Sequence, residues 1–356
     1  NTVAATRDTS ASFVDPRMKN AMAIFETLRL YGLGYVIDPD SSYMELSKDE
    51  DALDYLQFPA QTLDYRAGDC DDLSIMYAAL LESVGTPSAF ITVPGHIYTA
   101  FRLEMPADEA RRSFANGDDL ILLDGAAWVP VETTLVNEGF IRAWEVGARQ
   151  WRENSGRGVS ELYPVRDAWV DFEPTGFSGE ALDLDLPDAR DIQEAFARSL
   201  DAFVEKELAP QVEDLLVRIE ESDSNPRLVN RLGALYARYG QLDEARRQFE
   251  IVVRAREYAP ALMNLGNIAY IRSEFDEARS WYERALELDP GSARILVSIA
   301  RTHYEQGQFE EAAVWYREAH VMDPEVAERF AYIVDTAGRT GRASSASRDE
   351  SVLWHD

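Results

Sequence analysis

Cysteine, lysine and histidine are scarce in this sequence, and their scarcity excludes several classes of site. Cys70 is the single cysteine among 356 residues, so the sequence excludes an internal disulfide and a cysteine-rich zinc site. Lysine occurs at Lys19, Lys48 and Lys206, among 35 basic residues. The formal net charge of −29 argues against nucleic acid and anionic membranes as partners, because both repel an acidic surface.

Long apolar runs and nucleotide-binding motifs are also missing. No apolar stretch reaches membrane-spanning length, and no phosphate loop or dinucleotide fingerprint precedes a helix, so we expect no cofactor. Asp69, Asp71 and Asp72 lack the spaced ligands and the glycine of a calcium loop, so we expect helix-start carboxylates and no metal site. A hydrophobic content of 46% over this length predicts a globular chain of two domains.

The stretch 66–73 places the lone cysteine at the start of a predicted helix. Apolar residues recur at helical spacing after Cys70, and Gly85 and Pro87 end the pattern. A thiol at a helix N-terminus lies beside free backbone N–H groups and the positive end of the helix dipole, which favour the reactive thiolate. The neighbouring aspartates oppose this effect, so we expect a base from elsewhere in the chain. A lone cysteine is often a buried apolar residue, but these polar flanks favour a nucleophile.

The candidate base is His96, the one histidine in residues 1–302. It follows the turn residues Pro94 and Gly95 and begins a stretch, 96–104, that alternates as a strand. A histidine on a strand can be purely structural, but its pairing with a candidate nucleophile favours the role of base.

The candidate carboxylate is Glu132. Residues 120–123 and 128–133 are predicted to be two strands joined by a short turn at Asp124, and Glu132 lies near the end of the second. A helix with a cysteine, a strand with a histidine and a strand with a carboxylate make a nucleophile–base–orienter arrangement. We assign Glu132 as the orienter of His96, with Asp124 as the alternative.

Three motifs together resemble the transglutaminase-like superfamily. They are Gly-Asp-Cys-Asp-Asp at residues 68–72, Gly-His at 95–96, and Trp-Val-Pro-Val-Glu-Thr-Thr at 128–134, and the resemblance covers residues 20–175. It implies an α+β papain-like fold in which the Cys70 helix packs on an antiparallel sheet. It also implies attack by the thiol on a carboxamide or peptide carbonyl, which gives a thioester. We favour hydrolysis of this thioester over transamidation, because nothing in the sequence marks a second amine site. The family usually has Asp where Glu132 stands, which is one methylene shorter.

An amide or hydroxyl ahead of the nucleophile can stabilise the oxyanion together with the backbone N–H of Cys70. The candidates are Gln57, Gln61 and Tyr65, and the sequence does not choose among them.

A repeat of 33 and 34 residues begins near residue 225. Small residues recur where two helices cross closely, and aromatic residues recur where they fill the gap. One set of small residues is Gly233, Gly266 and Ala300, and a second set is Ala245, Ala278 and Ala312. The aromatic set is Phe249, Tyr282 and Tyr316. The pattern resembles three tetratricopeptide repeats, which form an all-α solenoid with a groove for a peptide or a protein partner.

The expected organisation has five parts: a flexible leader at 1–12, the cysteine domain at 13–180, a linker with helices at 181–224, repeats with a capping helix at 225–337, and a disordered tail at 338–356. The leader favours an extracytoplasmic location, after removal of an upstream signal, over a cytoplasmic one. We expect an enzyme that acts on a protein or peptide substrate, with the repeats recruiting substrate or partner. The alternative is a non-catalytic scaffold that uses both parts for docking.

Overall fold

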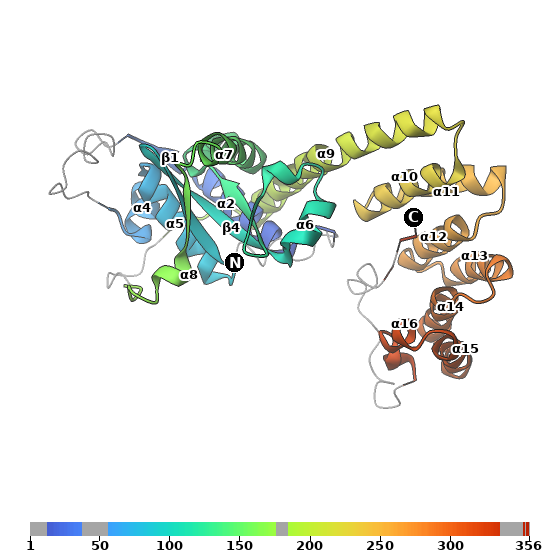
Figure 1. The fold of residues 1–356 in the computed structure, drawn as a ribbon. Helices are drawn as coiled ribbons and strands as arrows, with labels where there is room; N and C mark the ends of the chain where they lie inside the picture. Colours follow the sequence, from blue (N-terminus) through green and yellow to red (C-terminus); the bar gives the residue numbers. More distant parts are fainter. Residues whose placement is uncertain (1–12, 38–55, 176–183, 335–351, 353, 356) are drawn as a thin grey trace. The chain divides into compact units, whose positions relative to one another are not determined.

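The computed structural model describes residues 13–37, 56–175, 184–334, 352, 354 and 355 (Figure 1). Contacts divide the chain into two compact units, of which unit 1 contains Val14–Glu207 and unit 2 contains Leu208–Asp356. The expected leader and most of the expected tail lie outside the described residues.

Unit 1 is built on a five-stranded antiparallel sheet with the strand order β5-β6-β4-β3-β7. The strands are β3 (Ser88–Val93), β4 (His96–Pro106), β5 (Ile121–Leu123), β6 (Ala126–Val131) and β7 (Glu161–Pro164). The turn between β5 and β6 has positive φ at Asp124 (50°) and Gly125 (76°), as a two-residue hairpin turn of the mirror-image type requires. The two strands expected around this turn are therefore a hairpin.

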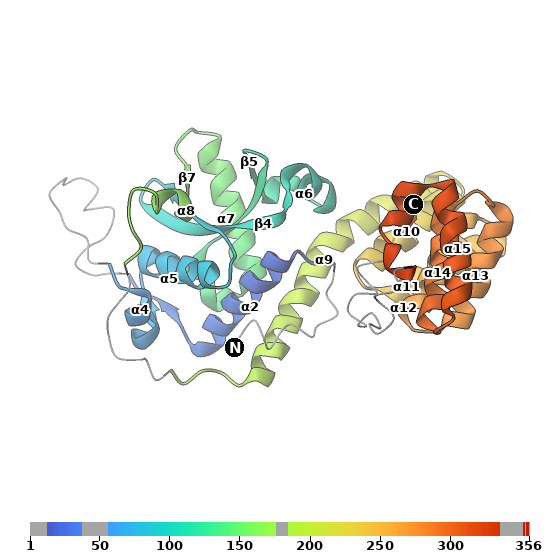
Figure 2. The same cartoon turned by 90° about the horizontal axis from the view of Figure 1, so that it is seen from below.

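Helices cover both faces of this sheet (Figure 2). On β4, the Thr99 hydroxyl donates to the carbonyl of Ser74 in α5 (Cys70–Ser83), and the Tyr98 hydroxyl donates to the carbonyl of Gly147 in α7 (Phe140–Ser155). Successive strand residues point to opposite faces, so α5 and α7 lie on opposite sides. A Cβ on Gly147 would lie 2.8 Å from the Pro130 carbonyl oxygen, so glycine permits the close approach of α7.

Shorter elements complete unit 1. Helix α2 (Pro16–Tyr31) lies beside α5, where the Tyr77 hydroxyl donates to the Ala21 carbonyl. Strands β1 (Gly34–Tyr35) and β2 (Ala67–Gly68) form a separate parallel pair. The others are α4 (Pro59–Tyr65), α6 (Ala107–Ser113), η1 (Gly117–Asp119), η2 (Thr133–Glu138) and α8 (Val165–Ala168). The Cys70 helix on an antiparallel sheet agrees with the expected α+β arrangement.

Helix α9 (Ala189–Glu221) continues through Pro210 and contains the boundary between the units. Its part in unit 1 is held by an ion pair of 2.6 Å between Lys206 Nζ and Asp119 Oδ2. The Phe203 ring stacks on Trp144 in the same region, with centroids 6.2 Å apart. These residues lie in the segment for which the sequence predicts linker and helices.

Unit 2 consists of helix pairs with the predicted repeat. The pairs are α10 (Pro226–Arg238) with α11 (Leu242–Ala255), α12 (Ala259–Ile271) with α13 (Phe275–Leu288), and α14 (Ala293–Glu305) with α15 (Phe309–Met322). A Cβ on Gly233 would lie 2.5 Å from the Phe249 ring, and one on Gly266 would lie 2.4 Å from the Tyr282 ring. In each of these two pairs, the glycine of the first helix therefore packs against the aromatic ring of the second helix.

The end of the chain differs from expectation in two ways. The expected capping helix at 325–337 is the shorter α16 (Pro324–Glu328), followed by the 3-10 turn η3 (Ala331–Ile333), because Phe330 and Ile333 turn inward onto the last helix pair. The tail was expected to be disordered from residue 338. Its described residues, Val352, Trp354 and His355, instead pack on the repeats, because Val352 and Trp354 are large apolar side chains.

Candidate active site

Cys70 is the first residue of α5, as expected. The helix begins there because the side chain of the N-cap residue Asp69 accepts a hydrogen bond of 3.3 Å from the N–H of Asp72. The thiol is 9% exposed. The backbone N–H of Cys70 belongs to the first turn, whose N–H groups have no acceptor within the helix, so it can donate to a bound substrate.

His96 begins β4, directly after Gly95, whose φ of 77° makes the tight turn from β3. Its Nε2 lies 2.7 Å from Oε2 of Glu132. The Cys70 side chain is near enough to the ring to raise the pKa of His96. Because Nε2 faces the carboxylate, Nδ1 is the ring nitrogen left for the thiol. The structure thus brings together three residues that lie 26 and 36 positions apart in the sequence.

Glu132 directly follows β6 and is the N-cap residue of η2. Its Oε1 accepts a 3.2 Å hydrogen bond from the N–H of Thr134 and a 2.7 Å bond from the Thr134 hydroxyl, so Oε2 is directed at His96. The carboxylate is 2% exposed. The alternative carboxylate, Asp124, lies at the opposite end of β6, in the turn from β5, so the backbone course of the hairpin separates it from His96.

The electrostatics of the three residues are coupled. Burial lowers the pKa of His96, but hydrogen bonds to Cys70 and Glu132 and the negative charge of both outweigh burial and raise that pKa to about 10. Burial raises the pKa of Glu132, but the hydrogen bond and charge of His96, together with Thr134, leave it lowered. The imidazolium and the carboxylate therefore stabilise each other as an ion pair at neutral pH.

A buried hydroxyl network fixes the cysteine helix relative to the end of β6. The Ser74 hydroxyl lies 2.6 Å from the Cys70 carbonyl oxygen and 3.0 Å from the hydroxyl of Thr133, the residue after Glu132. The hydroxyl of Thr99 on β4 donates to the Ser74 carbonyl. All three hydroxyl side chains are buried, so the network holds the thiol and the carboxylate in a fixed relation.

The three oxyanion candidates occupy different positions. The backbone N–H of Gln57 donates a 2.7 Å hydrogen bond to Oδ1 of Asp72, which holds Gln57 beside the first turn of α5. The amide oxygen of Gln57 is buried and has no hydrogen-bond partner. Gln61 is occupied in its own helix, where its side chain accepts from the N–H of Phe58. Tyr65 is 60% exposed at the end of α4.

Tyr35 is a neighbour of the thiol that is not predicted as a site residue from the sequence. The parallel pairing of β1 with β2 places it opposite Gly68, two residues before Cys70. Burial, followed by the negative charges of Cys70, Asp69 and Glu132, raises the pKa of Tyr35, so its hydroxyl keeps its proton at neutral pH. Its signal in the sequence is an aromatic residue in a glycine-rich stretch, which does not reveal a two-residue strand.

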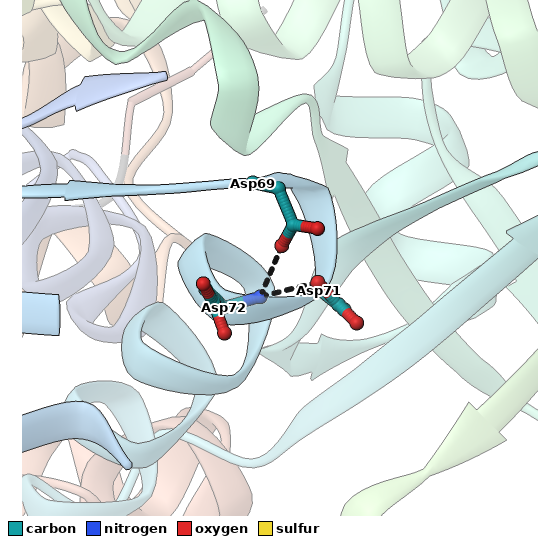
Figure 3. A group of neighbouring side chains, drawn as sticks. All are labelled: Asp69, Asp71 and Asp72. Carbon is teal, nitrogen blue, oxygen red and sulfur yellow. Dashed lines mark hydrogen bonds between the residues drawn. The ribbon is translucent and has the colours of Figure 1, made fainter. Parts of the chain in front are cut away.

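The acidic group on both sides of the nucleophile, Asp69, Asp71 and Asp72, is shown in Figure 3. One carboxylate oxygen from each of Asp69, Asp71 and Asp72 lies within 4.8 Å of the others, a spacing that could hold a metal ion. Oδ1 of both Asp69 and Asp71 accepts from the Asp72 N–H, and Asp72 itself is 4% exposed and accepts from Gln57. These bonds give the carboxylates a structural role at the helix start.

The second unit is similar to a known repeat family. A family model for the tetratricopeptide repeat matches residues 257–324. The matched tetratricopeptide repeats comprise α12 to α15, and the preceding pair α10–α11 has the same glycine-to-aromatic contact. No transglutaminase-like family model matches, and no curated protein matches the chain. Among the described residues, no helix combines the length and the hydropathy needed to span a bilayer.

Proposed function

We propose that unit 1 is a transglutaminase-like cysteine hydrolase with a papain-like fold, acting on amide bonds of a protein or peptide. The observation that carries the proposal is the 2.7 Å pair between His96 and Glu132, with Cys70 close enough to raise the pKa of the same imidazole. Three groups of the required types, from a helix start, a strand start and a strand end, meet in a partly buried site. A buried glutamate facing a histidine costs desolvation, so its presence needs a reason beyond packing.

The proposed reaction uses a thiolate and an imidazolium. Cys70 Sγ attacks the carbonyl carbon. The C–N bond then breaks, His96 gives its proton to the leaving amine, and the acyl group stays on Cys70 as a thioester. Neutral His96 then takes a proton from water, and the resulting hydroxide attacks the thioester. The C–S bond breaks, a carboxylic acid is released, and the pair of Cys70 thiolate and His96 imidazolium is restored. Glu132 holds the Nε2 proton throughout, so Nδ1 is the nitrogen that exchanges protons with substrate.

The oxyanion of each tetrahedral intermediate needs at least two donors. We assign the backbone N–H of Cys70 as one. The side-chain amide of Gln57 is our choice for the second, because its backbone is anchored to Asp72 in the first turn of the same helix. The hydroxyl of Tyr35 is the other donor whose position and protonation suit this role.

The tetratricopeptide repeats are proposed to recruit the substrate or a protein partner. This follows from their family match and from the helix-pair packing of unit 2. A recruiting surface on the same chain raises the local concentration of substrate at the cysteine site.

The test measures alkylation of Cys70 by iodoacetamide between pH 5 and pH 9, read by intact mass. Since the chain has one cysteine, each label reports on this site. We expect labelling at pH 6 that falls at least about tenfold in His96→Ala and is unchanged in the control His303→Ala. Hydrolysis of a peptide-amide library should be lost in Cys70→Ala and His96→Ala. Equal labelling of all three proteins, without turnover, would favour a docking module.

A further inference from the structure

The last described residues of the chain lie against the helices of unit 2. Val352 is 8% exposed and belongs to a buried cluster with Leu262 and Ile295. Trp354 packs against this cluster and against its neighbour around α10 and α11, and its indole stacks on Phe249, with centroids 6.5 Å apart and planes at 14°. Val352 and Trp354 are therefore two apolar anchors at alternate sequence positions, the spacing that side chains on one face of an extended peptide have.

The main chain beyond these anchors, at His355, is also recognised. The carbonyl oxygen of His355 accepts from the side-chain amides of Asn230 (2.7 Å) and Asn264 (2.8 Å), and its N–H donates to Oδ1 of Asn264 at 2.9 Å. Both asparagines are fully buried, on α10 and α12. Asparagine amides that bind main-chain groups do not read the side chain of His355, so they recognise a peptide of any residue there.

The segment completes the hydrogen bonding of Asn264. Oδ1 of Asn264 accepts from the N–H of His355, and its amide nitrogen donates to the His355 carbonyl and, at 3.2 Å, to Oδ1 of Asn230. With the segment in place, none of these amide atoms is buried without a partner, which would be strongly unfavourable. A cavity of about 400 Å³ next to His355, lined among others by Met263, Arg294 and Val326, leaves space for further residues of a ligand. The surface thus has three features of a peptide-binding site. They are the Phe249 ring on which Trp354 stacks, the amides of Asn230 and Asn264, and the adjacent cavity.

We propose that the surface formed by α10, α12 and α14 is a peptide groove whose resident ligand is provided by the chain's own Val352, Trp354 and His355. A protein partner binds by presenting an extended segment with tryptophan followed by a residue whose main chain enters the Asn230–Asn264 clamp, and it must displace the resident segment. The inference specifies the partner class for the repeats in the proposed function. It does not depend on chemistry at Cys70, so either proposal can fail alone.

The test uses a fluorescein-labelled peptide of residues 350–356, Glu-Ser-Val-Leu-Trp-His-Asp, and fluorescence anisotropy. A segment tethered to its own groove has an effective concentration on the order of millimolar. The intact chain should therefore bind the peptide at least about tenfold more weakly than a chain ending at residue 349, if the peptide Kd is below about 100 µM. Replacing Trp354 by Ala in the peptide should weaken binding to the shortened chain at least about tenfold.

Controls keep the outcome decisive. Asn264→Ala in the shortened chain should abolish binding, whereas the matched control Asn154→Ala in unit 1 should leave it unchanged. If the shortened chain does not fold, carboxypeptidase digestion of the intact chain replaces it: release of Trp354 should be at least about tenfold faster in Asn264→Ala than in the intact parent or in Asn154→Ala. Equal peptide binding by intact and shortened chains, equal digestion rates, or a dimer by light scattering would overturn the resident-ligand proposal.

Discussion

Replacing Glu132 by glutamine tests the proposed site with the least change of shape. The carboxylate now accepts three hydrogen bonds, two from Thr134 on Oε1 and one from His96 Nε2 on Oε2. Glutamine has one acceptor oxygen and one donor nitrogen. If its oxygen stays with Thr134, its NH₂ faces Nε2, which must then accept, and a protonated imidazole no longer fits.

The magnitude follows from the charge that is lost. His96 holds a pKa of about 10 against an ordinary value of 6.5, with Glu132 and Cys70 as the groups that raise it. One opposite charge at hydrogen-bond distance accounts for about 1–3 pKa units, or about 1.4–4 kcal/mol in the balance between imidazolium and imidazole. In Glu132→Gln, the charge of Glu132 no longer opposes the lowering of the pKa by burial, and only Cys70 still does. The pKa of His96 should therefore fall by about 1–3 units.

The assay is a titration of the His96 ring by NMR with labelled histidine, paired with iodoacetamide labelling of Cys70 at pH 6. Glu132→Gln should shift the His96 titration into an observable range and slow labelling at least about tenfold. The matched control is Glu138→Gln, since Glu138 ends the same short helix and is 54% exposed. An unchanged His96 titration and unchanged labelling in Glu132→Gln would refute the coupling of the three residues.

Three further predictions concern the site and the repeats. Tyr35→Phe should leave labelling of Cys70 within about twofold but reduce turnover at least about tenfold, if the hydroxyl is an oxyanion donor; unchanged turnover would leave that role to another group. The unfolding free energy, measured by urea titration, should fall as pH rises from about 7 to 9.5, because folded His96 keeps its proton up to about pH 10 whereas the unfolded chain releases it near 6.5. In His96→Gln the unfolding free energy should depend less steeply on pH. An equally steep pH dependence in both proteins would contradict the raised pKa of His96. Gly266→Ala should destabilise unit 2 by about 1–3 kcal/mol, because the new Cβ would lie 2.4 Å from Tyr282, whereas Gly291→Ala, with open space around it, should have little effect in thermal unfolding.

The sequence predicted most of what depends on local periodicity. The cysteine helix, the strand that begins at His96 and the hairpin around Asp124 follow from apolar spacing and from turn residues, which act over a few positions. The helix pairs of unit 2 follow from recurrence of small and aromatic residues at fixed spacing, because such recurrence reflects one packing contact made repeatedly. In both cases the information lies within about one repeat of the chain.

Tertiary structure decided the geometry between distant segments. Which carboxylate faces His96 depends on the direction in which β6 leaves the sheet, and the nearness of Tyr35 to the thiol depends on a parallel pair of two residues each. The positions of Val352, Trp354 and His355 depend on contacts with segments far away in the sequence. His355, for example, is hydrogen-bonded to the buried Asn264, 91 positions before it. The composition of the tail predicts disorder because it averages over many polar residues, whereas a few apolar anchors and main-chain hydrogen bonds suffice to hold its end.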